Sequence, residues 1–95
     1  MDATNTTAEL LELLASLSPT VRRALGAARL AISADSTSTE AEALTAGRTA
    51  GELAFRAGLS VDAMWVAFPG FRQASAAWSA FVDGWHDAAE ARAAA

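Results

Sequence analysis

The 95-residue sequence contains no cysteine and no lysine, and only two prolines. Without cysteine, disulfide bonds and thiolate metal sites are excluded. No apolar run approaches the length of a membrane span, and the N-terminal stretch carries an acidic residue where a signal peptide needs positive charge. We therefore expect a cytoplasmic protein that does not enter a membrane.

Positive charge is scarce, because seven arginines stand against 11 carboxylates and give a net charge of −4. Arginine without lysine, together with heavy use of alanine, is typical of high-GC bacterial genomes and their phages. Alanine favours helix but contributes little buried area, so the core depends on three Trp, four Phe and the larger aliphatic residues. A core this thin favours a homodimer, because a second copy can cover apolar surface.

Helical periodicity runs through the whole chain, and no segment alternates as a half-buried strand would. The capping-box pattern Thr6-Thr7-Ala8-Glu9 precedes a helical stripe of Leu10, Leu11, Leu13, Leu14 and Leu17. Ser18-Pro19 then predicts the start of a second helix that ends near Ala34, before a polar loop at residues 35–39.

Thr39 and Glu42 predict the start of a third helix over residues 40–57. Two glycines within it, Gly47 and Gly51, indicate either a close approach of a neighbouring helix or a break near Gly47. Gly58 is suited to end this helix.

Ser60 is suited to cap a short helix over residues 61–67, and a last helix is expected from near Gly70 to the C-terminus. The predicted fold class is therefore all-α: one domain over residues 1–95, a compact bundle of four to five helices containing a helix-turn-helix-like corner. Residues 1–5 and 91–95 are expected to fray.

The proposed corner is the segment LAFRAGLSVDAMWVAFPGF, residues 53–71. It resembles the DNA-binding segment of TetR-type repressors, which runs apolar-Ala-x-x-Ala-Gly-apolar-Ser-x-x-x-apolar-aromatic-x-x-Phe-Pro. The matching positions are Leu53, Ala54, Ala57, Gly58, Leu59, Ser60, Met64, Trp65, Phe68 and Pro69. The resemblance implies a helix that enters the major groove of duplex DNA and cations that contact its phosphates. The residues implied are Ser60, Val61, Asp62 and Ala63 for the groove, and Arg48, Thr49, Arg56 and Arg72 for the phosphates.

The segment departs from the family in ways that bear on DNA binding. Phe71 stands where the family usually has a lysine. The upstream helix over residues 21–32 lies too far from the corner for the family's usual spacing, and the family's large ligand-binding domain has no counterpart. Three arginines against Glu52 and Asp62 leave residues 48–72 with a charge of only +1. Because affinity for DNA depends on cations placed against phosphates, a monomer should bind weakly. A dimer would double the number of arginines that can contact phosphates. The alternative is a plain structural corner between two helices.

A second resemblance covers the run from Leu25 to Ser60, with Thr39-Glu40-Ala41-Glu42-Ala43 at its centre. This run resembles an uncharacterised helical-hairpin family of bacterial and phage proteins, and it would account for the long connection that departs from the TetR pattern. It implies no known chemistry.

An aromatic stripe occupies the C-terminal third of the chain, at spacings of 3, 7, 3 and 4 residues: Phe68, Phe71, Trp78, Phe81 and Trp85. Such a stripe is either the core against which the first three helices pack or, in part, a surface for another copy or a target protein. We expect mainly core, with one edge forming a dimer or partner interface. The residues assigned to that interface are Phe71, Trp78, Phe81 and Trp85.

Asp83, His86, Asp87 and Glu90 lie close together in the last predicted helix. They are either two or three ligands of a metal site or the solvated face of an amphipathic helix, and we favour the second interpretation. The sequence contains no nucleophile elbow or phosphate loop, so we predict no catalytic residue, metal or cofactor. We predict a helix-turn-helix transcriptional regulator that binds DNA as a homodimer, because the ten-position match is the most specific pattern in the sequence. The alternative is a non-enzymatic protein-interaction module or phage-encoded inhibitor with acidic and aromatic surfaces.

Overall fold

The computed structural model describes residues 3–95, and places side chains from Thr6 onward. No strand occurs in that part of the chain, which confirms the all-α fold class. The elements in order are α1 (Ala3–Leu17), α2 (Pro19–Thr37), α3 (Glu40–Arg56), α4 (Val61–Ala67), the 3-10 helix η1 (Pro69–Gln73) and α5 (Ser75–Ala94).

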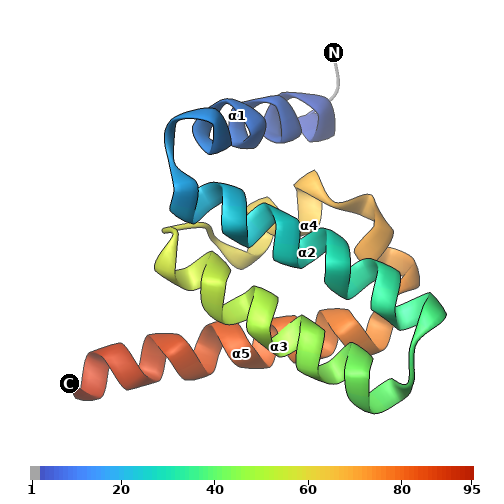
Figure 1. Ribbon diagram of the computed structural model, residues 1–95. Coiled ribbons are helices and arrows are strands. Elements are labelled where there is room, and N and C mark those ends of the chain that lie inside the picture. Colours follow the sequence, from blue (N-terminus) through green and yellow to red (C-terminus); the bar gives the residue numbers. More distant parts are fainter. Residues whose placement is uncertain (1–2) are drawn as a thin grey trace.

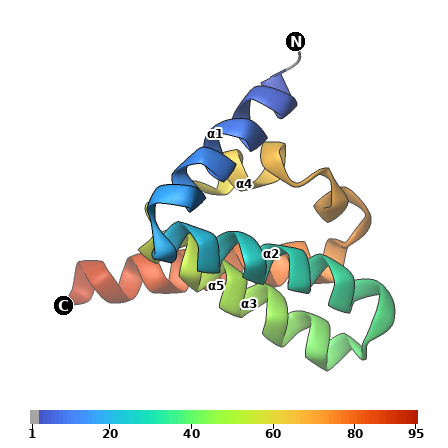
Figure 2. The same ribbon diagram turned by 45° about the horizontal axis from the view of Figure 1, so that its top comes forward.

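The antiparallel helices α2 and α3 form a hairpin, and α5 packs along the other side of α3 (Figure 1). On the opposite side of α2, α1 packs against both α2 and α4, and it stands away from the α3–α5 layer (Figure 2). The C-terminal end of α5 extends past the rest of the bundle (Figure 1). Within the described residues, α1 is therefore held chiefly by α2 and α4.

Glycines on α3 and α5 let these two helices approach closely. An added Cβ at Gly51 would overlap the Phe81 carbonyl oxygen, and one at Gly84 would overlap that of Arg48. Gly47 meets the backbone of α5 in the same way. Because α3 continues unbroken through both of its glycines, the close-approach interpretation is confirmed and the break near Gly47 is wrong.

Three predicted N-caps are present, and each hydroxyl oxygen accepts a hydrogen bond from the backbone N–H three residues on. The donor–acceptor distances are 3.3 Å from Val21 to Ser18, 3.2 Å from Glu42 to Thr39 and 3.1 Å from Ala63 to Ser60. Such caps satisfy N–H groups that the first turn leaves without a partner. The starts of α2, α3 and α4 are therefore confirmed.

Other predicted helix ends are wrong. The first helix begins at Ala3, so Thr6 lies inside it and is not its N-cap. The polar loop is shorter than expected, because α2 continues to Thr37 while the Ser36 and Thr37 hydroxyls donate to the Ser33 carbonyl. At the C-terminus, residues 91–95 are expected to fray. In the structure α5 continues to Ala94, so all of them except Ala95 are helical.

The last helix starts five residues later than expected, because Pro69 opens a separate 3-10 turn. Ala74, in the N-cap position of α5, has no side chain that could accept a hydrogen bond. The carboxylate of Asp35, on α2, instead accepts the N–H of Ala77 at 3.1 Å. A residue expected in a loop therefore caps the first turn of a helix distant in sequence.

The largest fully buried side chains are Leu25, Met64, Phe71 and Phe81. Around them the aromatic rings pack on one another: Trp78 stacks on Phe81 with centroids 5.1 Å apart, and Phe71 contacts both. No polar or charged residue of the described side chains is buried. The aromatic stripe thus forms the centre of the core, as the first of its two interpretations predicts.

Candidate interaction surfaces

The connection between α3 and α4 has the predicted turn. Gly58 has φ 77°, its N–H donates to the Phe55 carbonyl at 3.0 Å, and the Leu59 N–H donates to Ala54 at 2.9 Å. This hydrogen-bond pair ends a helix through a left-handed residue and folds the next apolar side chain back onto the core. Leu59 is indeed buried. Beyond the turn, α4 packs chiefly on α1.

The proposed groove-reading residues have limited exposure. Ser60 and Asp62 are exposed, whereas Val61 and Ala63 are half-buried and Met64 is fully buried. Within α4 the most accessible side chain is therefore a carboxylate, Asp62. If α4 entered the major groove, this carboxylate would bring charge of the same sign as the DNA phosphates.

The cations expected on DNA phosphates have different environments. Arg48 forms an ion pair with Asp87 of α5, and the Arg72 guanidinium lies 5.6 Å from the ring centroid of Trp65. Arg56 and Thr49 are exposed, on different turns of α3. Of the three arginines, only Arg56 forms neither an ion pair nor a cation–π contact with a described side chain.

The aromatic residues assigned to an interface are largely covered by the chain itself. Phe71 and Phe81 are buried, so they offer no surface to a second copy in this fold. Trp85 is half-buried against the ring of Phe55, and its Nε1 donates to the Leu59 carbonyl at 2.8 Å. Trp78 is half-buried between neighbouring rings. The physical reason is that α3, α2 and η1 pack against α5 and cover these rings.

The acidic group on α5 is dispersed. Asp87 binds Arg48, and the His86 ring lies edge-on to Trp85. Within the described residues no group of three His, Asp or Glu side chains is close enough to hold a metal ion.

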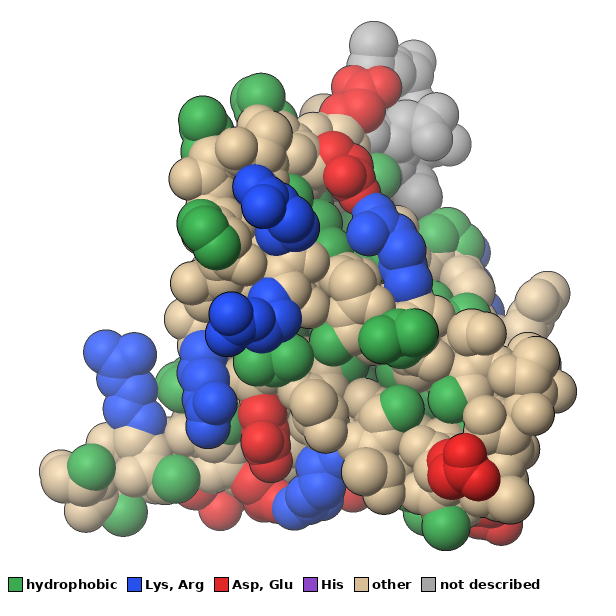
Figure 3. Space-filling view, in the orientation of Figure 1, with side chains coloured by type: hydrophobic (Ala, Val, Ile, Leu, Met, Phe, Trp, Pro, Cys, Tyr) green, Lys and Arg blue, Asp and Glu red, His purple; other side chains and the backbone are tan. Residues whose placement is uncertain are grey.

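Four of the six exposed large apolar side chains among the described residues lie on α1, where the sequence predicts no site. These four are leucines that we call the leucine stripe: Leu10 (55% exposed), Leu13 (60%), Leu14 (39%) and Leu17 (78%). Leu11 and Ala15, on another face of α1, are buried against the bundle. Figure 3 shows apolar side chains protruding along the outer edge of α1. Residues 10–17 contain five leucines, which is more than a single apolar face about 100° wide can hold. The sequence therefore already indicates that some of these leucines do not face the core.

Between α1 and the bundle the packing is incomplete. A cavity of about 240 Å³ is lined by residues of α1, α2 and the C-terminal end of α4, among them Leu11, Leu25 and Ala67, and by Phe68 directly after α4. Glu12 on α1 and Arg29 on α2, which also line the cavity, form an exposed ion pair. The contact of α1 with the bundle therefore rests on few apolar side chains.

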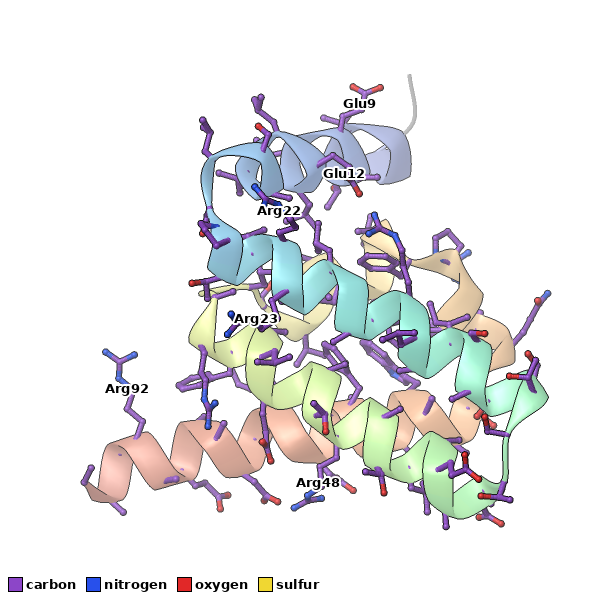
Figure 4. All side chains as sticks on the ribbon, viewed as in Figure 1. Glu9, Glu12, Arg22, Arg23, Arg48 and Arg92 are labelled. Atoms are coloured by element: carbon purple, nitrogen blue, oxygen red, sulfur yellow. The ribbon has the colours of Figure 1, made fainter. Side chains whose placement is uncertain are left out.

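Arginines gather on one side of the molecule (Figure 3). Figure 4 places Arg22 and Arg23 of α2 and Arg92 of α5 on this side, and Arg56 lies in the last turn of α3, next to the start of α2 in the hairpin. We call these four residues the arginine surface. All four are exposed, and none of their side chains forms a hydrogen bond or an ion pair with another described residue.

Comparison with protein families, with characterised proteins and with solved structures finds no match to this chain. None of the helices within residues 3–95 combines the length and apolar character that crossing a bilayer requires.

Proposed function

We propose that this protein is a non-enzymatic protein-interaction module that binds through the leucine stripe of α1. The observation that carries the proposal is the exposure of these four leucines, which occupy successive turns of one helix face. Soluble monomers rarely leave contiguous apolar patches of this kind uncovered unless the patch is functional. The spacing, i, i+3, i+4 and i+7, is that of side chains that anchor one helix to another.

A protein fits the leucine stripe better than a lipid surface does. Helices that lie on membranes carry Lys or Arg on their polar face. The polar face of α1 carries Glu9 and Glu12 instead, and residues 3–17 contain no basic side chain. Anionic headgroups would repel such a helix. The half-buried state of Trp78 and Trp85 also supports this choice of surface, because the aromatic residues first considered for a partner are engaged in the core.

Selection from a displayed peptide library tests the proposal without knowledge of the natural partner. The bait is the folded chain, and counter-selection uses the double variant Leu13→Glu, Leu17→Glu. Both leucines are exposed, so the variant should keep its helix content in circular dichroism. We expect enrichment of amphipathic helical peptides on the wild type and on the matched variant Leu30→Glu, which alters an exposed leucine of α2 (69% exposed). Equal enrichment on the double variant would contradict the proposal.

A second function, the binding of duplex DNA as a homodimeric regulator, is favoured by the arginine surface. Four exposed arginines without acidic partners are a large share of the seven in an acidic chain. In this form of the proposal, Arg22, Arg23, Arg56 and Arg92 supply phosphate contacts in place of Arg48 and Arg72. The logarithm of the binding constant falls linearly with the logarithm of the salt concentration. Each phosphate that an arginine neutralises makes that slope steeper by about 0.9.

Fluorescence anisotropy of a labelled duplex at low and at physiological salt tests this second function. We expect affinity that falls steeply with salt, and a reduced slope in the double variant Arg22→Gln, Arg23→Gln. Arg48→Gln is the matched control, because Arg48 is already paired with Asp87. Absence of binding at low salt would exclude the arginine surface as a DNA interface.

A further inference from the structure

The leucine stripe has a symmetry that identifies one partner above others. Its spacings along α1 are 3, 1 and 3, so the pattern is the same when it is followed from either end. Two copies of α1 placed face to face and antiparallel would therefore bring Leu10 opposite Leu17 and Leu13 opposite Leu14. A surface that is complementary to itself across a two-fold axis is what an isologous dimer requires.

Charge along α1 also favours a second copy in the antiparallel orientation. Glu9 is exposed near the N-terminal end, and Arg22 is exposed next to the C-terminal end (Figure 4). Neither has an ion-pair partner within the described residues. A two-fold axis perpendicular to α1 brings the polar side of one α1 next to the polar side of the other. Glu9 of each copy then faces the C-terminal end of the other α1, next to which α2 carries Arg22.

The surface to be covered is substantial relative to what holds α1 in place. The four exposed fractions, 55, 60, 39 and 78%, together equal more than two fully exposed leucines per copy. Against the bundle, α1 buries one leucine, Leu11, beside the cavity described above. A helix of 15 residues has little stability without tertiary contacts, so a second copy would supply burial that the single chain lacks.

We propose that the leucine stripe is the interface of a homodimer, in which α1 of a second copy of this chain packs antiparallel across an axis near Leu13 and Leu14. This inference rests on the proposed function, namely that the leucine stripe binds protein. It places the dimer interface on α1 and not on the aromatic residues of α5.

The first test is the molar mass of the full chain by sedimentation equilibrium, between about 1 µM and about 1 mM. We expect the mass to rise from 9.8 kDa to twice that value as the concentration increases. Leu13→Glu, Leu17→Glu should weaken dimerisation about tenfold or more, because four leucines of the dimer are replaced by carboxylates. Leu30→Glu should leave it unchanged. A wild type that stays at 9.8 kDa throughout overturns the homodimer.

Disulfide cross-linking tests the antiparallel orientation of the two α1 helices. The sequence has no cysteine, so only the introduced cysteines can react. A mixture of Leu10→Cys copies with Leu17→Cys copies should form the mixed disulfide, since a disulfide needs Cα atoms within about 7 Å. Each variant alone should form few disulfides, as should the control Leu30→Cys. Preferential pairing of Leu10→Cys with itself would overturn the antiparallel arrangement.

A charge exchange gives an independent test. Glu9→Arg and Arg22→Glu should each weaken dimerisation by about two- to fivefold, and the double variant should restore it, as expected for an exposed ion pair. A double variant no tighter than either single variant contradicts the antiparallel contact. The peptide selection separates the two proposals: a monomeric chain that still enriches helical peptides keeps the proposed function and loses the homodimer, whereas a chain that does neither loses both.

Discussion

The close approach of α3 and α5 predicts that Gly51→Ala destabilises the protein, although alanine is the better helix former. The added Cβ would overlap the Phe81 carbonyl oxygen and lie 2.8 Å from the Trp85 backbone nitrogen. Both atoms belong to the backbone of α5 and cannot rotate away. The substitution must therefore push the two helices apart, along an interface that includes the buried Phe81.

The magnitude is the difference between two opposing effects. Alanine gains about 1 kcal/mol in helix propensity over glycine. Overpacking a well-packed core typically costs about 1–3 kcal/mol, and a rigid backbone contact belongs at the upper end of that range. We expect the free energy of unfolding to fall by about 2 kcal/mol, which corresponds to a decrease in Tm of about 8–16 °C for a domain of this size.

Urea unfolding, followed by circular dichroism and by tryptophan fluorescence, measures this change. The matched control is Gly26→Ala on α2, where an added Cβ meets no heavy atom within 4 Å. That substitution should raise the free energy of unfolding by about 0.5–1 kcal/mol. If Gly51→Ala stabilises the protein as Gly26→Ala does, the reasoning from close helix contact is refuted.

Three further substitutions test single features by the same urea assay. Gly58→Ala should cost about 1–2 kcal/mol because its φ of 77° is strained for alanine, and Gly58→Asn should cost less; equal stability of all three forms would contradict the left-handed turn. Asp35→Ala should cost about 1 kcal/mol and speed hydrogen exchange at the Ala77 amide, and unchanged exchange there would exclude the cap on α5. Trp85→Phe should cost about 1 kcal/mol through the lost hydrogen bond to the Leu59 carbonyl, whereas a neutral substitution would mean that solvent replaces the indole.

The parts of the fold that depend on neighbouring residues follow from the sequence. Ser18, Thr39 and Ser60 each cap the helix that follows, because a hydroxyl reaches an N–H only three residues away. Gly58 adopts the left-handed conformation that its position after a helix predicts. In these cases the interacting atoms lie within one turn of each other, so residue type and spacing are enough to identify them.

Contacts between distant residues do not follow in the same way. The run of Asp, Ser and Thr around Asp35 predicts a loop, but the Asp35 carboxylate caps α5 by accepting the N–H of a residue 42 positions away. Arg48 was assigned to phosphate because of its place in the TetR-like segment, but it pairs with Asp87. Each assignment depended on which helices become neighbours, and local spacing carries no information about that.

The two apolar stripes show why the sequence predicts an interface on the aromatic residues whereas the structure exposes the leucines of α1. Spacing shows which side chains share a helix face, but exposure depends on what packs against that face. The aromatic residues of α5 are covered because Gly47, Gly51 and Gly84 allow α3 to lie directly against that helix. In α1, Leu11 and Ala15 already occupy the side that meets the bundle, so the leucines about a third of a turn away have no element left to cover them. The glycines of one interface thus explain why the aromatic residues are core, and the surplus of leucines in α1 is the reason why we propose a partner.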